Sequence, residues 1–232
     1  MNTESATHSS SRPAARKVLV VGATGGSGRA AVAALAGAGH HVTAFSRHAD
    51  RLAGQIEGIT TINGDAMNKA DVDHAVAGHD AVIVTLGITE NPIRVRILGP
   101  KHTPADVRSA GTRNVIDAMK SHGIERLVVQ SSYGIGETAQ HLRIRDRLFF
   151  ALLVKQQMAD TAVQESVVRS SGLDWTLVQP VHLTEAVDGP DAFTSTDGRA
   201  RKMTVGRGPV GRVLAAIVGD ESLRHKTVSV SG

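Results

Sequence analysis

A glycine-rich segment close to the start of the chain restricts the possible folds more than any other part of the sequence. A short apolar run, Lys17–Val21, leads directly into glycines at positions 22, 25 and 28, and the small residues of 29–37 then have the composition of a helix. A strand, a tight glycine turn and a helix in this order begin a βαβ unit of the dinucleotide-binding type. Glycine allows the turn and a close approach of phosphate, and the helix N-terminus offers N–H donors and a positive dipole end. We therefore expect a diphosphate at this turn; the alternative is a glycine turn without a ligand.

The rest of the chain alternates apolar runs with helical segments. Many of the runs are continuously apolar, which is typical of parallel strands buried on both faces. We therefore predict an α/β fold, a Rossmann-like doubly wound parallel sheet of six or seven strands, in a single domain over residues 17–232. Strands are expected at 17–21, 41–45, 59–62, 80–84, 126–130, 175–179 and 227–230, and helices at 29–37, 69–77, 105–122, 143–170 and 210–219.

Three segments stand outside this alternation. Residues 1–16 are rich in Ser and Thr and are expected to form a disordered tail. Residues 88–104 contain three prolines and are interpreted as a long loop, which is expected to act as a flap over the site. Residues 180–207 are expected to form a small C-terminal lobe that faces the substrate.

Composition excludes several classes of site. The chain has no cysteine, so disulfides, thiolate metal sites and a cysteine nucleophile are excluded. No apolar run approaches the roughly 20 residues of a membrane span, and the formal charge of +4 comes without a nucleic-acid motif. The 11 histidines are not spaced as metal ligands. We expect no metal, no nucleic acid and no membrane partner, a small-molecule substrate and a cytoplasmic location, and leave monomer and homodimer open.

The ends of the predicted strands carry the other candidate binding residues. Arg47 and Arg51 follow the second strand, where NAD-binding proteins usually have an acidic residue, so they favour the 2′-phosphate of NADPH. Asp65 follows the third strand at the edge where adenine would lie, and Leu86-Gly87 ends the fourth. The alternatives are exposed surface arginines and an aspartate that caps a turn.

The ordered set of motifs resembles the atypical short-chain dehydrogenase/reductases of the NAD(P)H-binding, NmrA-like superfamily, and within them the biliverdin-IXβ reductase/flavin reductase type. The likeness runs from about residue 16 to the C-terminus. It is carried by Gly22–Gly28, Arg47 with Arg51, Gly64-Asp65, residues 70–84, Gly111–Gly123, Ser131-Ser132, Ser171–Leu173 and Gln179–His182.

The resemblance implies a role for each matching residue. The diphosphate would lie against the glycine turn, the 2′-phosphate at Arg47 and Arg51, and adenine at Asp65 and Ala66. Leu86 and Gly87 would line the ribose. Ser131 and Ser132 would lie beside the nicotinamide, and the residues after the sixth strand would cover its carboxamide end. The turn residues are Gly22, Ala23, Thr24, Gly25, Gly26, Ser27, Gly28 and Arg29, and the covering residues are Pro180, Val181 and His182.

The chain departs from the family where acid–base chemistry would lie. Tyr133 is followed four residues later by Glu137 instead of the lysine of the Tyr-x-x-x-Lys motif. Thr161 stands where extended-type relatives carry a lysine and the flavin reductase type a histidine. Ser132, Tyr133 and Ser131 are the catalytic candidates; strand-end capping is the alternative for the serines, and a structural role the alternative for His182.

These residues favour an NADPH-dependent reductase that transfers a hydride to a flavin or related conjugated acceptor, where solvent or a weakly acidic hydroxyl can supply the proton. Two alternatives remain. One is a reductase, epimerase or isomerase of a specialised metabolite, and the other is an NmrA-like sensor that binds NADP(H) without consuming it.

Overall fold

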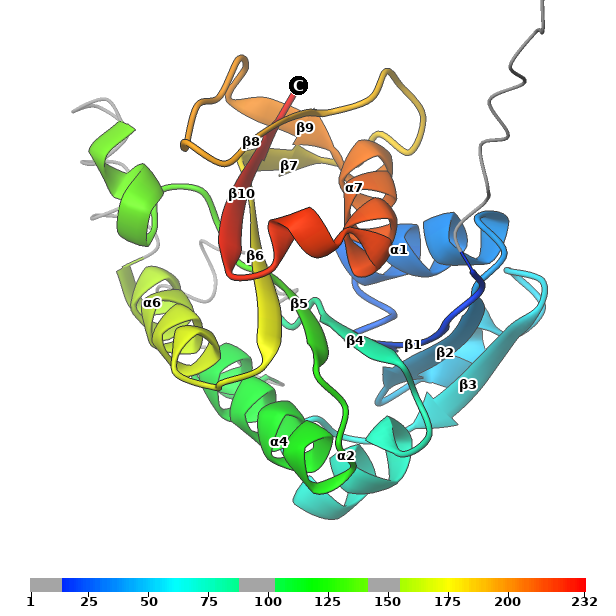
Figure 1. Cartoon of the computed structure of the whole chain (residues 1–232). Helices are drawn as coiled ribbons and strands as arrows, with labels where there is room; N and C mark the ends of the chain where they lie inside the picture. Colours follow the sequence, from blue (N-terminus) through cyan, green and yellow to red (C-terminus); the bar gives the residue numbers. More distant parts are fainter. Residues whose placement is uncertain (1–13, 88–102, 142–154) are drawn as a thin grey trace, which may run out of the picture.

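The computed structural model describes residues 14–87, 103–141 and 155–232, and the structural statements below refer to these ranges. One sheet of eight strands, in the order β3-β2-β1-β4-β5-β6-β10-β8, forms the centre of the molecule (Figure 1). All neighbouring pairs are parallel except β10 with β8. The parallel strands are β1 (Lys17–Val21), β2 (His41–Ser46), β3 (Ile59–Asn63), β4 (Ala81–Val84), β5 (Arg126–Gln130), β6 (Asp174–Pro180) and β10 (Lys226–Ser231).

Helices cover both faces of this sheet. Figure 1 shows α1 (Gly26–Gly37) and α7 (Arg207–Gly219) together on one face, and α2 (Lys69–Val76), α4 (Val107–Ser121) and α6 (Lys155–Arg169) on the other. Alternate residues of each central strand enter the two cores: Val18 and Val20 of β1 pack on the α1 and α7 side, whereas Leu19 and Val21 pack on the opposite side. Burial on both faces explains why these strands are continuously apolar. Short 3-10 helices lie at Ala49–Leu52 (η1), Gly136–His141 (η2) and Glu221–Leu223 (η3).

The strand order places the candidate site. From β1 the chain proceeds outward to β2 and β3, and then returns to β4 on the other side of β1. Such a reversal opens a crevice at the carboxyl ends of the strands, which is where ligands bind in open α/β sheets. The turns after β1, β2, β3, β4, β5 and β6 all lie at this edge, so the topology brings the predicted site residues to one side of the sheet.

The predicted doubly wound sheet is confirmed, and each of its seven predicted strands matches within one residue at either end. Two helices begin earlier than predicted. Helix α1 begins at Gly26 instead of 29, and α7 begins at Arg207 instead of 210. The first turn of a helix tolerates Gly208 and Pro209, because N–H groups there have no partner within the helix.

The C-terminal segment differs in part from the expected lobe. Strands β7 (His182–Thr184) and β9 (Thr204–Gly206) pair with each other away from the main sheet. Strand β8 (Phe193–Ser195) instead extends the main sheet as an antiparallel edge strand on β10. Of the expected tail at 1–16, residues 1–13 lie outside the described residues, whereas Arg16 donates its N–H to His40 Nδ1 (3.1 Å) just before β1. Residues 88–102 of the expected flap at 88–104 and residues 143–154 of the expected helix at 143–170 also lie outside the described residues.

Candidate functional site

The glycine turn after β1 is built by close backbone contacts. Gly22 has a φ of +85°, and a Cβ there would lie 3.0 Å from the backbone of Thr85 at the end of β4. A Cβ on Gly28 would lie 2.2 Å from the carbonyl oxygen of Gly22. Two of the three glycines are therefore required for packing of the turn against β4 and α1.

Gly25 is different, because its surroundings are open. A Cβ there would touch one atom within 4 Å, the Gly22 carbonyl oxygen at 3.4 Å. Gly25 is also the N-cap of α1, and no side chain caps the N–H groups of that helix end. Open space beside an uncapped helix N-terminus suits a bound anion, so the turn fits the diphosphate of a dinucleotide.

The end of β2 presents the two predicted arginines. Arg47 follows the last residue of β2, and Arg51 lies in η1; both are exposed. Ser46, the last residue of β2, accepts a hydrogen bond at its Oγ from the Oγ1 of Thr24, over 3.2 Å. The strand end that carries the arginines is thereby joined to the glycine turn.

The turn after β3 is held by internal hydrogen bonds. Asp65 accepts a bond from the backbone N–H of Met67 at Oδ1 (3.0 Å), and its own N–H donates to Asp71 Oδ2 (2.9 Å). The Ala66 carbonyl accepts from Nδ2 of Asn114 on α4 (2.9 Å). The side chain of Asp65 therefore caps the turn, which was the alternative considered from the sequence. Its contact with adenine stays a prediction.

The end of β4 meets α4. A Cβ on Gly111 would lie 2.6 Å from Leu86, so the glycine lets α4 approach the strand end. The guanidinium of Arg108 lies beside Gly87, with Nη2 2.9 Å from the position of a Cβ there. Burial lowers the pKa of Arg108, and the nearby Asp160 carboxylate opposes that shift. Asp160 also accepts the backbone N–H groups of Arg108 and Ser109, at 3.1 and 3.2 Å.

Three consecutive hydroxyls follow β5, and they have different surroundings. Ser131 is buried and donates to the Glu165 carboxylate on α6. Tyr133 is 5% exposed, and its hydroxyl donates to the carbonyl of Gly198 (2.9 Å). Burial raises the pKa of Tyr133. Ser132 is half-buried, and its hydroxyl forms no hydrogen bond among the residues that the structure describes.

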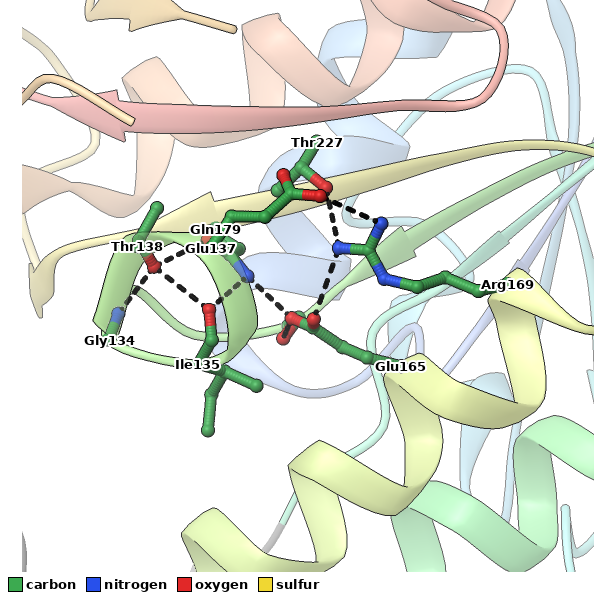
Figure 2. A network of polar contacts seen from close by, with 9 residues as sticks. Gly134, Ile135, Glu137, Thr138, Glu165, Arg169, Gln179 and Thr227 are labelled. Atoms are coloured by element: carbon green, nitrogen blue, oxygen red, sulfur yellow. Dashed lines mark hydrogen bonds and ion pairs between the residues drawn. The ribbon is translucent and has the colours of Figure 1, made fainter. Parts of the chain in front are cut away.

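Glu165 is the centre of a buried polar network that links α6, β6 and the segment after β5 (Figure 2). Its Oε1 accepts from Ser131 and from Nε2 of Gln179 (2.6 Å). The other carboxylate oxygen lies 3.6 Å from Nη2 of Arg169. Gln179 also donates to the Ile135 carbonyl (3.1 Å) and accepts from Thr138 Oγ1 (2.7 Å). The network fixes the backbone that carries the three hydroxyls.

The end of β6 is tied to its neighbours through the backbone. The Pro180 carbonyl accepts from Tyr133 N, and Val181 N donates to Val230 O, both at 3.0 Å. His182 begins β7, has an exposed side chain and donates its N–H to Met203 O (3.2 Å). These bonds set the position of the three predicted covering residues.

Sequence reasoning missed two side chains at the site. Glu165 is 34 residues from Ser131, and no local motif marked it. Arg207 is the first residue of α7, and its Nη1 donates a hydrogen bond to Ser27 Oγ in the glycine turn (3.2 Å). The two residues are 180 positions apart in the sequence. Such separations leave no spacing pattern that a single sequence could display.

Membrane spans, metal sites and cavities are the other features of the described residues that bear on function. No described helix has the length and apolar character needed to cross a membrane. Within the same ranges, no three side chains of His, Cys, Asp or Glu gather as metal ligands. A cavity of about 500 Å³ lies between β8 and α7, and none of the predicted site residues lines it.

Residues 22–221 match the NAD(P)H-binding family, a range that spans the glycine turn, the network and α7. The chain belongs to the NAD(P)H-binding family. This match confirms the predicted NAD(P)H-binding superfamily and a nicotinamide cofactor.

Several proteins resemble this member of the family. A 2-alkyl-3-oxoalkanoate reductase of Stenotrophomonas maltophilia is 37% identical over 126 residues, which are 54% of this chain and 36% of that protein. The alignment thus spans about a third of that relative. ChuY of Escherichia coli O157:H7, described as an anaerobillin reductase, is 23% identical with a TM-score of 0.71 and covers 93% of this chain and 96% of its own. A short-chain dehydrogenase/reductase of Veillonella parvula in complex with NADP is 17% identical, with a TM-score of 0.71 and coverages of 93% and 94%. At these identities the two structures show the shared fold.

Proposed function

We propose that the protein is an NADPH-dependent reductase that transfers a hydride to a conjugated acceptor such as a flavin or a linear tetrapyrrole. The observation that carries the proposal is the unequal use of the three hydroxyls after β5. The hydroxyls of Ser131 and Tyr133 donate hydrogen bonds to buried acceptors. Of the three, the Ser132 hydroxyl alone forms no hydrogen bond within the described part of the chain. Such a site suits a reaction that asks the protein for positioning more than for strong acid–base catalysis.

The cofactor would be held by residues from several strand ends. Open space at Gly25 and the uncapped end of α1 suit the diphosphate. Arg47 and Arg51 supply positive charge for a 2′-phosphate, which supports NADPH over NADH. Asp65 and Ala66 would meet adenine, Leu86 and Gly87 the ribose, and Pro180, Val181 and His182 the carboxamide.

The chemistry divides between the cofactor and the protein. The reduced nicotinamide supplies the hydride. Ser132 orients the acceptor beside it and passes a proton from solvent, while the Glu165 network holds the segment of Ser132 in place. The reductase names of a relative and of a structural neighbour support this class of reaction.

Steady-state NADPH oxidation with FMN, riboflavin and biliverdin as acceptors tests the proposal. Arg47→Ala is expected to raise KM for NADPH about tenfold or more, because a charge-assisted phosphate contact is lost. NADH lacks the 2′-phosphate, so its KM is the matched control and stays unchanged. Ser132→Ala is expected to lower kcat about tenfold or more with the NADPH KM unchanged.

Two results would contradict the proposal. Tight binding of NADPH without turnover on any acceptor would favour a sensor. Turnover of a ketone but not of flavin or biliverdin would favour a reductase of a specialised metabolite.

A further inference from the structure

We propose that Arg207 is a second binding residue for the cofactor diphosphate and faces the glycine turn from the neighbouring helix. The inference rests on the proposed binding of NADP(H) at this turn. It adds a residue from the far end of the chain to a site that the sequence placed entirely at the strand ends.

The packing of α7 on α1 brings Arg207 to the turn. A Cβ on Gly211 would lie 2.5 Å from the backbone of Ala30, so the two helices touch at these residues. Four residues earlier on each helix, the Cδ and Nε of Arg207 lie 2.5 Å from the position of a Cβ on Gly26. Because both contacts shift by one turn in the same direction, α1 and α7 run side by side with their N-termini together. Two helix ends of positive potential and a guanidinium therefore meet at one point.

The backbone of Arg207 is fixed by the glycines on either side of it. A Cβ on Gly206 would lie 2.7 Å from the Ala186 carbonyl oxygen, and a Cβ on Gly208 would overlap the carbonyl oxygen of Val187. Gly208 N also donates to Ala186 O at 3.0 Å. Close contact with the 186–187 segment thus sets where the Arg207 side chain begins, which is the kind of preorganisation that a binding residue needs.

The guanidinium has partners that a phosphate can supplement or replace. Nη1 donates to Ser27 Oγ (3.2 Å), and Nε lies 2.9 Å from Glu185 Oε1. The Arg207 side chain is 27% exposed, whereas that of Glu185 is 83% exposed. An ion pair with so exposed a carboxylate stabilises weakly. A phosphate between two helix N-termini would bind the guanidinium more strongly, because charge-assisted bonds to phosphate can be bidentate.

Calorimetric titration with two ligands tests the inference. NADP⁺ contains the diphosphate, whereas adenosine 2′-monophosphate keeps the 2′-phosphate and lacks the diphosphate. Arg207→Gln is expected to weaken NADP⁺ binding about ten- to a hundredfold, and to change the affinity for adenosine 2′-monophosphate by less than about twofold. Arg212→Gln is the matched control, since it removes the same charge from α7 where the arginine pairs with Asp191. It is expected to leave both affinities unchanged.

Glu185→Gln provides a second variant that keeps Arg207 intact. It removes the carboxylate that competes with phosphate, so NADP⁺ is expected to bind about two- to fivefold more tightly. Weaker binding by this variant would overturn the inference, because it would show that the pair itself supports the fold of the turn.

The remaining outcomes separate the inference from the proposed function. Unchanged NADP⁺ affinity in Arg207→Gln, beside a wild type that binds NADP⁺, would overturn the inference alone. Equal weakening of both ligands, or equal weakening by Arg212→Gln, would also overturn a direct diphosphate contact. A wild type that binds neither ligand would overturn the proposed function together with the inference.

Discussion

The buried carboxylate of Glu165 should contribute far more to stability than the exposed carboxylate of Glu137, although both pair with Arg169. The Nη1 of Arg169 lies 3.3 Å from Glu137, whose side chain is 63% exposed, and Nη2 lies 3.6 Å from Glu165, whose side chain is 4% exposed. Glu165 also accepts hydrogen bonds from Ser131 and Gln179. The two glutamates therefore offer a matched pair of alanine substitutions around one arginine.

The magnitude follows from these contacts. Each hydrogen bond to a buried charged group contributes about 1.5–3 kcal/mol, and removal of one partner from a buried ion pair costs about 3–5 kcal/mol. Since Arg169 keeps Glu137 and the hydroxyl of Thr227 (2.8 Å), the bonds from Ser131 and Gln179 carry most of the loss. We expect Glu165→Ala to lower the free energy of unfolding by about 3–5 kcal/mol. Glu137→Ala, as an exposed pair, should cost less than about 1 kcal/mol.

Urea unfolding followed by circular dichroism measures the free energy of unfolding of both variants. In thermal unfolding of a domain of this size, the loss expected for Glu165→Ala corresponds to a fall in Tm of about 10 °C. If both variants lost the same stability, or if Glu165→Ala lost less than about 1 kcal/mol, the hydrogen bonds to Glu165 would contribute less to the free energy of unfolding than we expect.

Three other residues offer tests by substitution, namely Tyr133, Arg126 and Gly25. Tyr133→Phe should lower the free energy of unfolding by about 1 kcal/mol at pH 7, because the variant loses the hydrogen bond to the Gly198 carbonyl. Because burial raises the folded pKa of Tyr133 above its ordinary value of 10.0, ionisation favours the unfolded chain as pH rises past 10, so the cost of Tyr133→Phe should shrink there in urea titrations at several pH values. Arg126→Met should cost about 3 kcal/mol in thermal unfolding, because bonds to the carbonyls of Asp174 (2.9 Å) and Ile217 (2.6 Å) are lost; an unchanged Tm would contradict this. Gly25→Ala should leave Tm nearly unchanged and weaken NADP⁺ about tenfold, since the methyl group enters the space assigned to the diphosphate, and unchanged NADP⁺ affinity would argue against that assignment.

Part of the site followed from local sequence because the relevant contacts are local. The strand, turn and helix over residues 17–37 are contiguous, and the requirements of the turn appear as glycines at fixed spacing. The other predicted residues follow strand ends, and parallel strands bring their carboxyl ends to one edge whatever their exact neighbours. The alternation of apolar runs and helices was therefore enough to group Arg47, Asp65, Gly87 and Ser132.

What distinguishes the three hydroxyls after β5 could not be predicted in the same way. In the sequence they are three adjacent polar residues of similar chemistry. The packing of α6 places Glu165 against Ser131, and the return of the C-terminal segment places the Gly198 carbonyl on Tyr133. A hydroxyl's availability depends on such partners, and these are set by packing over long separations.

The sheet, its open edge and the glycine turn could be predicted from the sequence, because backbone requirements and burial on two faces leave periodic traces along the chain. Which side chains share that edge depends on how the helices pack on the sheet and on one another. Arg207 reaches the turn because α7 packs on α1 through the gap left by Gly211, and Glu165 reaches β5 because α6 covers the opposite face. Those contacts depend on the shape of packed surfaces, which no spacing in a single sequence records.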